Sequence, residues 1–192
     1  TTAIPPVTST GYAYDLADRL TGITPTSGSA TSFTIDALGR HKAKTAAGVT
    51  DTYAYVGSSE VIAKITPSTG ASTSSIVDPT GARTAVSTSS GGFGWTLSDL
   101  HGNSAGYATL GGGVISDARR YDPYGETLAS VSSGLARPWG YQGRLLLSAS
   151  GDAELYDFVF RAYVPDLGAF SSPDDLAGSA LDPITFNRYL YA

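Results

Sequence analysis

Four aspartates recur at regular intervals along the chain and could be metal ligands: Asp15, Asp36, Asp78 and Asp122. A calcium site needs several oxygen ligands close together. At ligand spacing, only Asp15 has a second acidic residue, Asp18. An aspartate at the end of a strand instead accepts a hydrogen bond from a backbone N–H two residues later, in an Asx-turn. We therefore expect these carboxylates to form turns, and we expect no metal and no cofactor.

The other residues of catalytic type form no recognisable constellation. His41 and His101 follow or lie within turns and belong to no metal or hydrolase motif, so we expect both at the surface. No serine stands in a Gly-x-Ser-x-Gly elbow between a strand and a helix. The glycines from Gly111 to Gly113 precede no helical pattern, which argues against a phosphate loop. The sequence thus predicts a protein that is not an enzyme.

The aspartates belong to a repeated segment, and its best copy runs from Tyr121 to Glu126. A proline after the aspartate presets a type I turn, and a glycine three residues after it tolerates positive φ. The six copies start at Tyr14, Ile35, Tyr55, Val77, Leu97 and Tyr121. The intervals are 21, 20, 22, 20 and 24 residues, which indicates a repeat protein. The expected turn residues are Asp15, Asp36, Gly39, Asp78, Gly81, Asp122 and Gly125.

Alternating apolar and polar residues flank the turns. Phe33 and Ile35 predict one face of a strand and Thr34 the other, and Trp95 and Leu97 repeat the pattern. Each period is therefore a hairpin, which cannot bury its apolar face alone. We predict an all-β fold in which repeated antiparallel hairpins lie side by side in a long curved sheet.

The composition fits this interpretation. The 192 residues include 23 glycines, and only 15% of them are charged, which suits short strands and turns. The net charge of -5 and the lack of a basic patch argue against nucleic-acid binding. No cysteine supplies a disulfide, and no stretch of about eighteen apolar residues predicts a membrane span. Because methionine is absent, Thr1 is not an encoded start, and we expect a piece of a longer or processed protein.

The repeats, together with the last quarter of the chain, resemble the Rhs family. The segments Tyr14–Arg19 and Tyr121–Gly125 are similar to its tyrosine–aspartate (YD) repeats. The motifs that look like the Rhs core-associated region are Tyr141-Gln142-Gly143, Leu155-Tyr156-Asp157-Phe158, Arg161-Ala162-Tyr163, Pro165-Asp166-Leu167-Gly168-Ala169-Phe170, Ser172-Pro173-Asp174 and the segment Asn187–Ala192. The resemblance covers nearly all of the chain from about Gly11. The family usually has Asp, Arg and Pro where Val164, Ala169 and Asp175 stand.

The resemblance implies a structural segment of a shell that encapsulates a C-terminal toxin, in a protein that is secreted or at the cell surface. The implied partners are the rest of the same polypeptide and its toxin cargo. Many Rhs proteins also cleave themselves with aspartates in Asp-Pro-x-Gly motifs beyond the Asn-x-Tyr-x-Tyr segment. This chain stops before them, and Asp182-Pro183 lacks the glycine, so we expect no self-cleavage.

The core-associated region supplies further structural residues. They are Tyr156, Asp157, Arg161, Tyr163, Gly168, Phe170 and Asp174. Arg161 lies in an apolar run from Leu155 to Tyr163, which we expect to be one strand. A buried guanidinium needs a carboxylate, so we expect an ion pair with Asp157 or Asp174. We also expect a single helical turn from Asp174 to Gly178.

The predicted organisation has three parts: an extended leading segment or linker at 1–10, six hairpin repeats at 11–131, and a core-associated region at 132–192 that is truncated at its C-terminal end. Two alternative functions stay open. Exposed Tyr and Trp residues would suit a cell-surface module that binds a carbohydrate or a protein partner, and inward-facing Trp95 and Trp139 would count against it. Open strand edges would suit edge-to-edge self-association.

Overall fold

A computed structural model describes residues 9–110, 115–131, 138–148, 154–176 and 178–191. The repeat strands are β1 (Gly11–Tyr14), β2 (Leu20–Thr24), β3 (Thr31–Ile35), β4 (His41–Ala46), β5 (Val49–Tyr55), β6 (Ile62–Pro67), β7 (Thr73–Val77), β8 (Arg83–Thr88), β9 (Phe93–Ser98), β10 (Ser104–Thr109), β11 (Ile115–Ser116), β12 (Arg119–Tyr121) and β13 (Thr127–Ser130). After them come β14 (Leu145–Ser148), β15 (Leu155–Asp157), β16 (Ala162–Val164) and β17 (Ala169–Phe170), with short 3-10 helices η1 (Tyr141–Gly143), η2 (Pro165–Leu167) and η3 (Pro183–Phe186). No α-helix occurs in these ranges.

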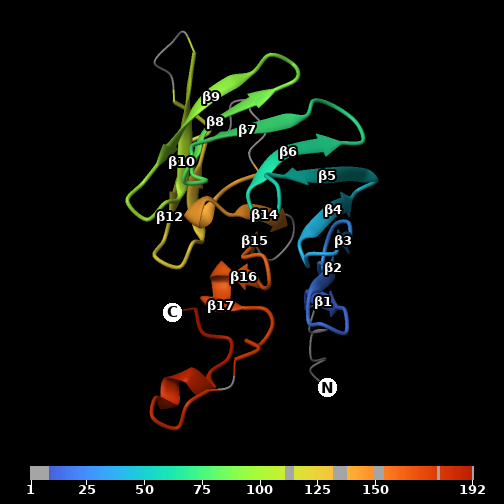
Figure 1. Cartoon of the computed structure of the whole chain (residues 1–192), viewed down its shortest axis with the longest axis vertical. Helices are drawn as coiled ribbons and strands as arrows, with labels where there is room; N and C mark the ends of the chain where they lie inside the picture. Colours follow the sequence, from blue (N-terminus) through green and yellow to red (C-terminus); the bar gives the residue numbers. More distant parts are fainter. Residues whose placement is uncertain (1–8, 111–114, 132–137, 149–153, 177, 192) are drawn as a thin grey trace, which may run out of the picture.

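Strands β1 to β11 form one sheet whose order in space is the order in sequence, and every neighbouring pair is antiparallel. Each strand therefore pairs with the next through a turn, as a stack of hairpins requires. The sheet is strongly curved and arches over β14 and β15 (Figure 1). The predicted all-β fold with a long curved sheet of hairpins is confirmed.

The sixth hairpin departs from this plan. Its strands β12 and β13 pair only with each other among the described residues, although we predicted them in the common sheet. Asp117, between β11 and β12, has a φ of 59° and is 1% exposed. A left-handed residue interrupts the extended backbone of a strand, and after this break β12 and β13 form a separate sheet. The glycines from Gly111 to Gly113, and the leading segment up to residue 8, lie outside the described residues.

The main core lies between the concave face of the sheet and the C-terminal strands. The sheet contributes Leu20, Ile23, Phe33, Tyr53, Ile62, Ile65, Val86 and Tyr107, and the C-terminal part contributes Trp139, Leu145, Leu147, Leu155, Ala162 and Val164. A single cluster of apolar side chains thus spans both parts. Each part covers the apolar surface of the other. Burial of apolar surface is the dominant favourable term in folding, so the two parts stabilise each other.

Strand β9 faces the other way from our prediction. We expected Trp95 and Leu97 on the buried face, but Trp95 is 49% exposed. In the ladder, the fully buried Val86 pairs with Gly94. Cross-strand partners share a face, so Trp95 takes the opposite face, where its ring meets Phe93 edge to face at 5.2 Å. Trp139, by contrast, is 1% exposed.

Two local expectations in the C-terminal part are wrong. The run from Leu155 to Tyr163 is two strands, β15 and β16, because the Asp157 carboxylate accepts a hydrogen bond from the N–H of Val159, whose φ of 73° turns the chain. The residues from Asp174 to Leu176 are not helical. The Asp174 carboxylate accepts from the N–H of Leu176 instead, at 2.9 Å, which closes a turn.

Candidate functional site

The repeated aspartates accept two backbone hydrogen bonds each. In the second copy, Asp36 Oδ1 accepts from the N–H of Leu38 at 2.9 Å and from that of Arg40 at 3.0 Å. Asp15, Asp78, Asp99 and Asp122 do the same with the residues two and four positions later. One carboxylate oxygen thus satisfies two N–H groups that the bend takes out of the ladder.

The other carboxylate oxygen is used differently from copy to copy. In the first two copies an arginine four residues later forms an ion pair with it: Arg19 with Asp15 at 2.5 Å and Arg40 with Asp36 at 2.7 Å. The glycines Gly39, Gly81 and Gly125 have φ values of 83°, 89° and 96°, and in the first copy Asp18 takes this left-handed position with a φ of 55°. No group of three potential metal ligands occurs in the part of the chain that is described.

His41 is buried, and our prediction of a surface residue is wrong. It begins β4 on the concave side, 5% exposed, with its ring 4.8 Å from that of Phe33. Its Nδ1 lies 2.8 Å from Asp157 Oδ2, and its Nε2 lies 3.2 Å from the carbonyl oxygen of Leu20. Both partners are acceptors, so both ring nitrogens donate in the imidazolium form. The His41–Asp157 pair therefore joins the second repeat to β15 by a buried charge-assisted hydrogen bond.

This pair predicts a pH dependence. Burial alone would lower the pKa of His41, but the hydrogen bond and the charge of Asp157 raise the pKa above its ordinary value. The stabilisation is complete below about pH 6.5, the ordinary value, and is lost as pH rises through the folded-state pKa. Chemical denaturation between pH 6 and 9 should show the free energy of unfolding falling with a slope of at most about 1.4 kcal/mol per pH unit. His41→Gln should remove this slope, and His101→Gln, at an exposed site, should keep it. The same slope in both variants would contradict the assignment.

Arg161 forms its ion pair with Asp174, at 2.9 Å, and not with Asp157, which is taken by His41. The guanidinium lies over the ring of Phe170, 3.8 Å from its centroid. It also donates to the carbonyl of Arg188 at 3.3 Å. This arginine thus ties the bend between β15 and β16 to the last segment of the chain.

A second cluster of rings fills the C-terminal end. Tyr156 and Tyr163 are fully buried, and Tyr163 packs edge to face on Phe170 at 5.8 Å and stacks on Tyr141 at 5.7 Å. The Tyr163 hydroxyl donates to the carbonyl of Tyr124 at 2.7 Å, which links β16 to the sixth turn. Gly168 ends η2 with a φ of 57°, as a left-handed cap. These contacts are structural, since the rings face one another and not a cavity.

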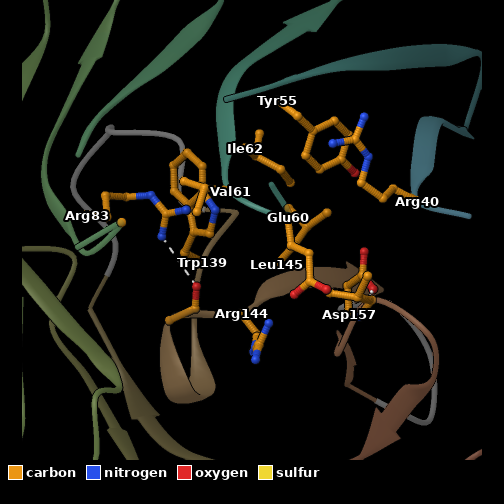
Figure 2. Close-up of a pocket in the computed structure, with 13 residues that line it drawn as sticks. Arg40, Tyr55, Glu60, Val61, Ile62, Arg83, Trp139, Arg144, Leu145 and Asp157 are labelled. Carbon is orange, nitrogen blue, oxygen red and sulfur yellow. Dashed lines mark hydrogen bonds between the residues drawn. The ribbon is translucent and has the colours of Figure 1, made fainter. Parts of the chain in front are cut away.

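Sequence reasoning missed three of the residues that line a pocket at this seam. They are Arg83, which follows the fourth turn, and Trp139 and Arg144, which flank η1. Figure 2 shows Arg83 lying against the ring of Trp139, with its hydrogen bond to the carbonyl of Gly143 drawn as a dashed line. The position of Arg83 in its repeat was the sequence signal that could have revealed its different role. It stands one residue later than Arg19 and Arg40 do in their copies, too far along to pair with its own turn aspartate.

No family model and no curated protein matches the sequence. The fold is similar to chains of several solved toxin structures. The crystal structure of TcdB2-TccC3-Cdc42 matches with a TM-score of 0.69 and 18% identity over 94% of this chain and 9% of that one. A Photorhabdus luminescens Tc holotoxin pore matches with a TM-score of 0.68 and 16% identity over 94% of this chain and 9% of that one. TcdB2-TccC3 matches with a TM-score of 0.67 and 18% identity over 94% of this chain and 10% of that one. This chain therefore spans a tenth or less of those chains, and the likeness concerns the fold.

Proposed function

We propose that this chain is a structural segment of a hollow β shell of the Rhs or YD-repeat type. The shell encloses a toxin or effector segment of the same polypeptide, which is secreted or presented at the cell surface. The observation that carries the proposal is the eleven-stranded sheet of hairpins, four of them closed by an aspartate, that arches over the C-terminal strands. The toxin chains with a similar fold support it, as does the sequence resemblance to the Rhs family.

Repetition explains why such a sheet encloses a space. Each hairpin adds a similar offset and rotation to the one before it, so a run of hairpins coils. The sheet as described still has an unpaired edge at β1 (Figure 1). In the proposed shell, a neighbouring repeat of the same polypeptide pairs with this edge. In the isolated chain, the edge is open to a second copy, and we propose edge-to-edge self-association there.

We propose no catalytic role for the chain. The buried and turn-forming polar groups serve its architecture: His41 and Asp157 bind each other, and the turn aspartates bind backbone N–H groups. These hydrogen bonds support a structural role for both sets of groups.

A second candidate function rests on Trp95. This ring is half exposed beside Phe93 on the outer face of β9, where it can stack on a sugar or pack against a protein. The exposure favours a binding module, whereas the burial of Trp139 does not. A glycan array that gives no signal would count against carbohydrate binding and favour the structural role.

Protease protection tests the shell. The proposal requires a longer polypeptide with an effector segment beyond residue 192. In that polypeptide the segment should be cut at least about tenfold more slowly than the same segment expressed alone, because the wall must open first. Mass spectrometry of a time course measures both rates, and the heat-denatured polypeptide is the control. Equal rates for the enclosed and the free segment would refute encapsulation.

A further inference from the structure

A pocket of about 200 Å³ lies where the turns of the second, third and fourth repeats meet the C-terminal part. Three of its lining residues are arginines, Arg40, Arg83 and Arg144, although the whole chain has a net charge of -5. In the view of Figure 2, Arg83 and Arg144 stand on one side and Arg40 on the other, with Glu60 between them. The pocket thus concentrates positive charge on an acidic protein.

Each of the three guanidinium groups lies over an aromatic ring. The distance to the ring centroid is 4.1 Å for Arg40 over Tyr55, 3.7 Å for Arg83 over Trp139 and 4.8 Å for Arg144 over Phe158. A ring attracts a cation through its face but accepts no strong hydrogen bond there. The N–H groups of the planar guanidinium lie in its own plane, so stacking leaves them directed sideways. Rings therefore hold these cations in place without neutralising them.

The charges around the pocket are unequally paired. Arg40 is paired with Asp36. Arg83 donates to two neutral acceptors, Ser75 Oγ at 3.0 Å and the carbonyl of Gly143 at 3.3 Å. Within the described ranges, neither Arg83 nor Arg144 lies within ion-pair distance of a carboxylate. Burial lowers the pKa of Arg83 to about 10, so the group stays charged at neutral pH while losing much of its hydration. An anion in the pocket would offset this cost.

The two carboxylates that line the pocket differ. Asp157 is held by His41 and is 9% exposed, so it is already neutralised. Glu60 is exposed and makes no ion pair within the described ranges. With Arg40 and Asp157 paired, the remaining charges are two arginines against one glutamate. One further negative charge fits this balance, and Glu60 is the group that would oppose its entry.

We propose that this three-arginine pocket binds a single carboxylate group carried on a small apolar body. The guanidinium edges of Arg83 and Arg144 donate charge-assisted hydrogen bonds to the carboxylate. Val61, Ile62 and Leu145 line the rest of the pocket and contact the apolar body. The volume admits one ring or one side chain, which excludes larger ligands. The carboxylate belongs either to a free small acid or to an acidic side chain of a peptide.

Calorimetric titration of the 192-residue chain tests this with matched ligand pairs. The first pair is 3-phenylpropionate and its neutral amide. The second is a blocked peptide with glutamate next to phenylalanine, and its glutamine counterpart. We expect a Kd of about 1 mM or lower for at least one acid, and binding at least about tenfold weaker for its amide. Binding of the free acid alone identifies a small-molecule site, and binding of the peptide alone identifies a side-chain site.

Fluorescence locates the binding. Trp95→Phe leaves Trp139, at the pocket, as the remaining tryptophan, so the acid should change its emission with the same Kd. Arg144→Gln should weaken binding about tenfold, because it removes a charged donor to the carboxylate. Glu60→Gln should strengthen binding several-fold, because it removes a negative charge that repels the ligand. Arg120→Gln, at an exposed site away from the lining, is the matched control and should change nothing.

Three results would overturn the proposal. The first is the absence of binding heat for both acids up to roughly 10 mM, which corresponds to less than about 3 kcal/mol of affinity. The second is equal binding of acid and amide. The third is equal binding by the Arg144→Gln, Glu60→Gln and Arg120→Gln variants, each first shown to unfold at the temperature of the parent protein.

Discussion

Asp157→Ala lowers the free energy of unfolding by about 3–5 kcal/mol, the cost of breaking one half of a buried ion pair. The side chains of His41 and Asp157 are 5% and 9% exposed, so water cannot replace the lost carboxylate. Their hydrogen bond spans 116 residues of sequence and joins the repeat sheet to β15. The substitution also removes the acceptor for the N–H of Val159, whose left-handed backbone this hydrogen bond supports. Both losses fall on the seam between the two halves of the core.

Urea denaturation followed by circular dichroism measures the effect. Asp175→Ala is the matched control, because Asp175 is exposed, and it should change the stability by no more than about 0.5 kcal/mol. The double variant His41→Ala with Asp157→Ala should cost less than the sum of the two single changes, since it leaves no unpaired charge behind. A strictly additive cycle, or an Asp157→Ala variant as stable as the Asp175→Ala control, would contradict the role of the pair.

The turns were predictable from sequence because their chemistry is local. The carboxylate of Asp36 accepts hydrogen bonds from the backbone within four residues. Gly39 adopts the positive φ that the same bend requires. The order of the hairpins follows as well, since each strand pairs with its sequence neighbour. The ion pair of Arg161 was predicted with two alternative partners, and Asp174 is the one that the structure has.

The seam was not predictable in the same way. Whether His41 faces solvent or core depends on how far the whole sheet curves and on what fills its concave side. Neither is encoded near residue 41. The orientation of Trp95 was predicted wrongly for a related reason. A strand with glycine on one face and tryptophan on the other can turn either face to the core. In this fold the space beside Val86 takes Gly94.

Gly125→Ala is expected to cost about 2–5 kcal/mol, and Gly81→Ala only about 1–2 kcal/mol, although both glycines hold the same place in their repeats. Their φ values, 96° and 89°, impose a similar strain on alanine. The surroundings differ. A Cβ on Gly81 would lie 3.4 Å from Val61 Cγ2, an ordinary contact, whereas a Cβ on Gly125 would lie 2.5 Å from Cγ of Tyr141.

The difference between the two variants measures how firmly Tyr141 is held. This ring is 2% exposed, it stacks on Tyr163, and its hydroxyl donates to the carbonyl of Pro123 at 3.0 Å. It cannot withdraw from a new methyl group without disturbing the aromatic cluster that attaches the sixth hairpin to the C-terminal strands. Urea denaturation gives the two free energies, and near-ultraviolet circular dichroism reports the tyrosine packing, which should change in Gly125→Ala and persist in Gly81→Ala. Equal costs with unchanged tyrosine signals would mean that the sixth turn rests on Tyr141 only loosely, and the sixth hairpin would then owe its place to chain connectivity and not to packing.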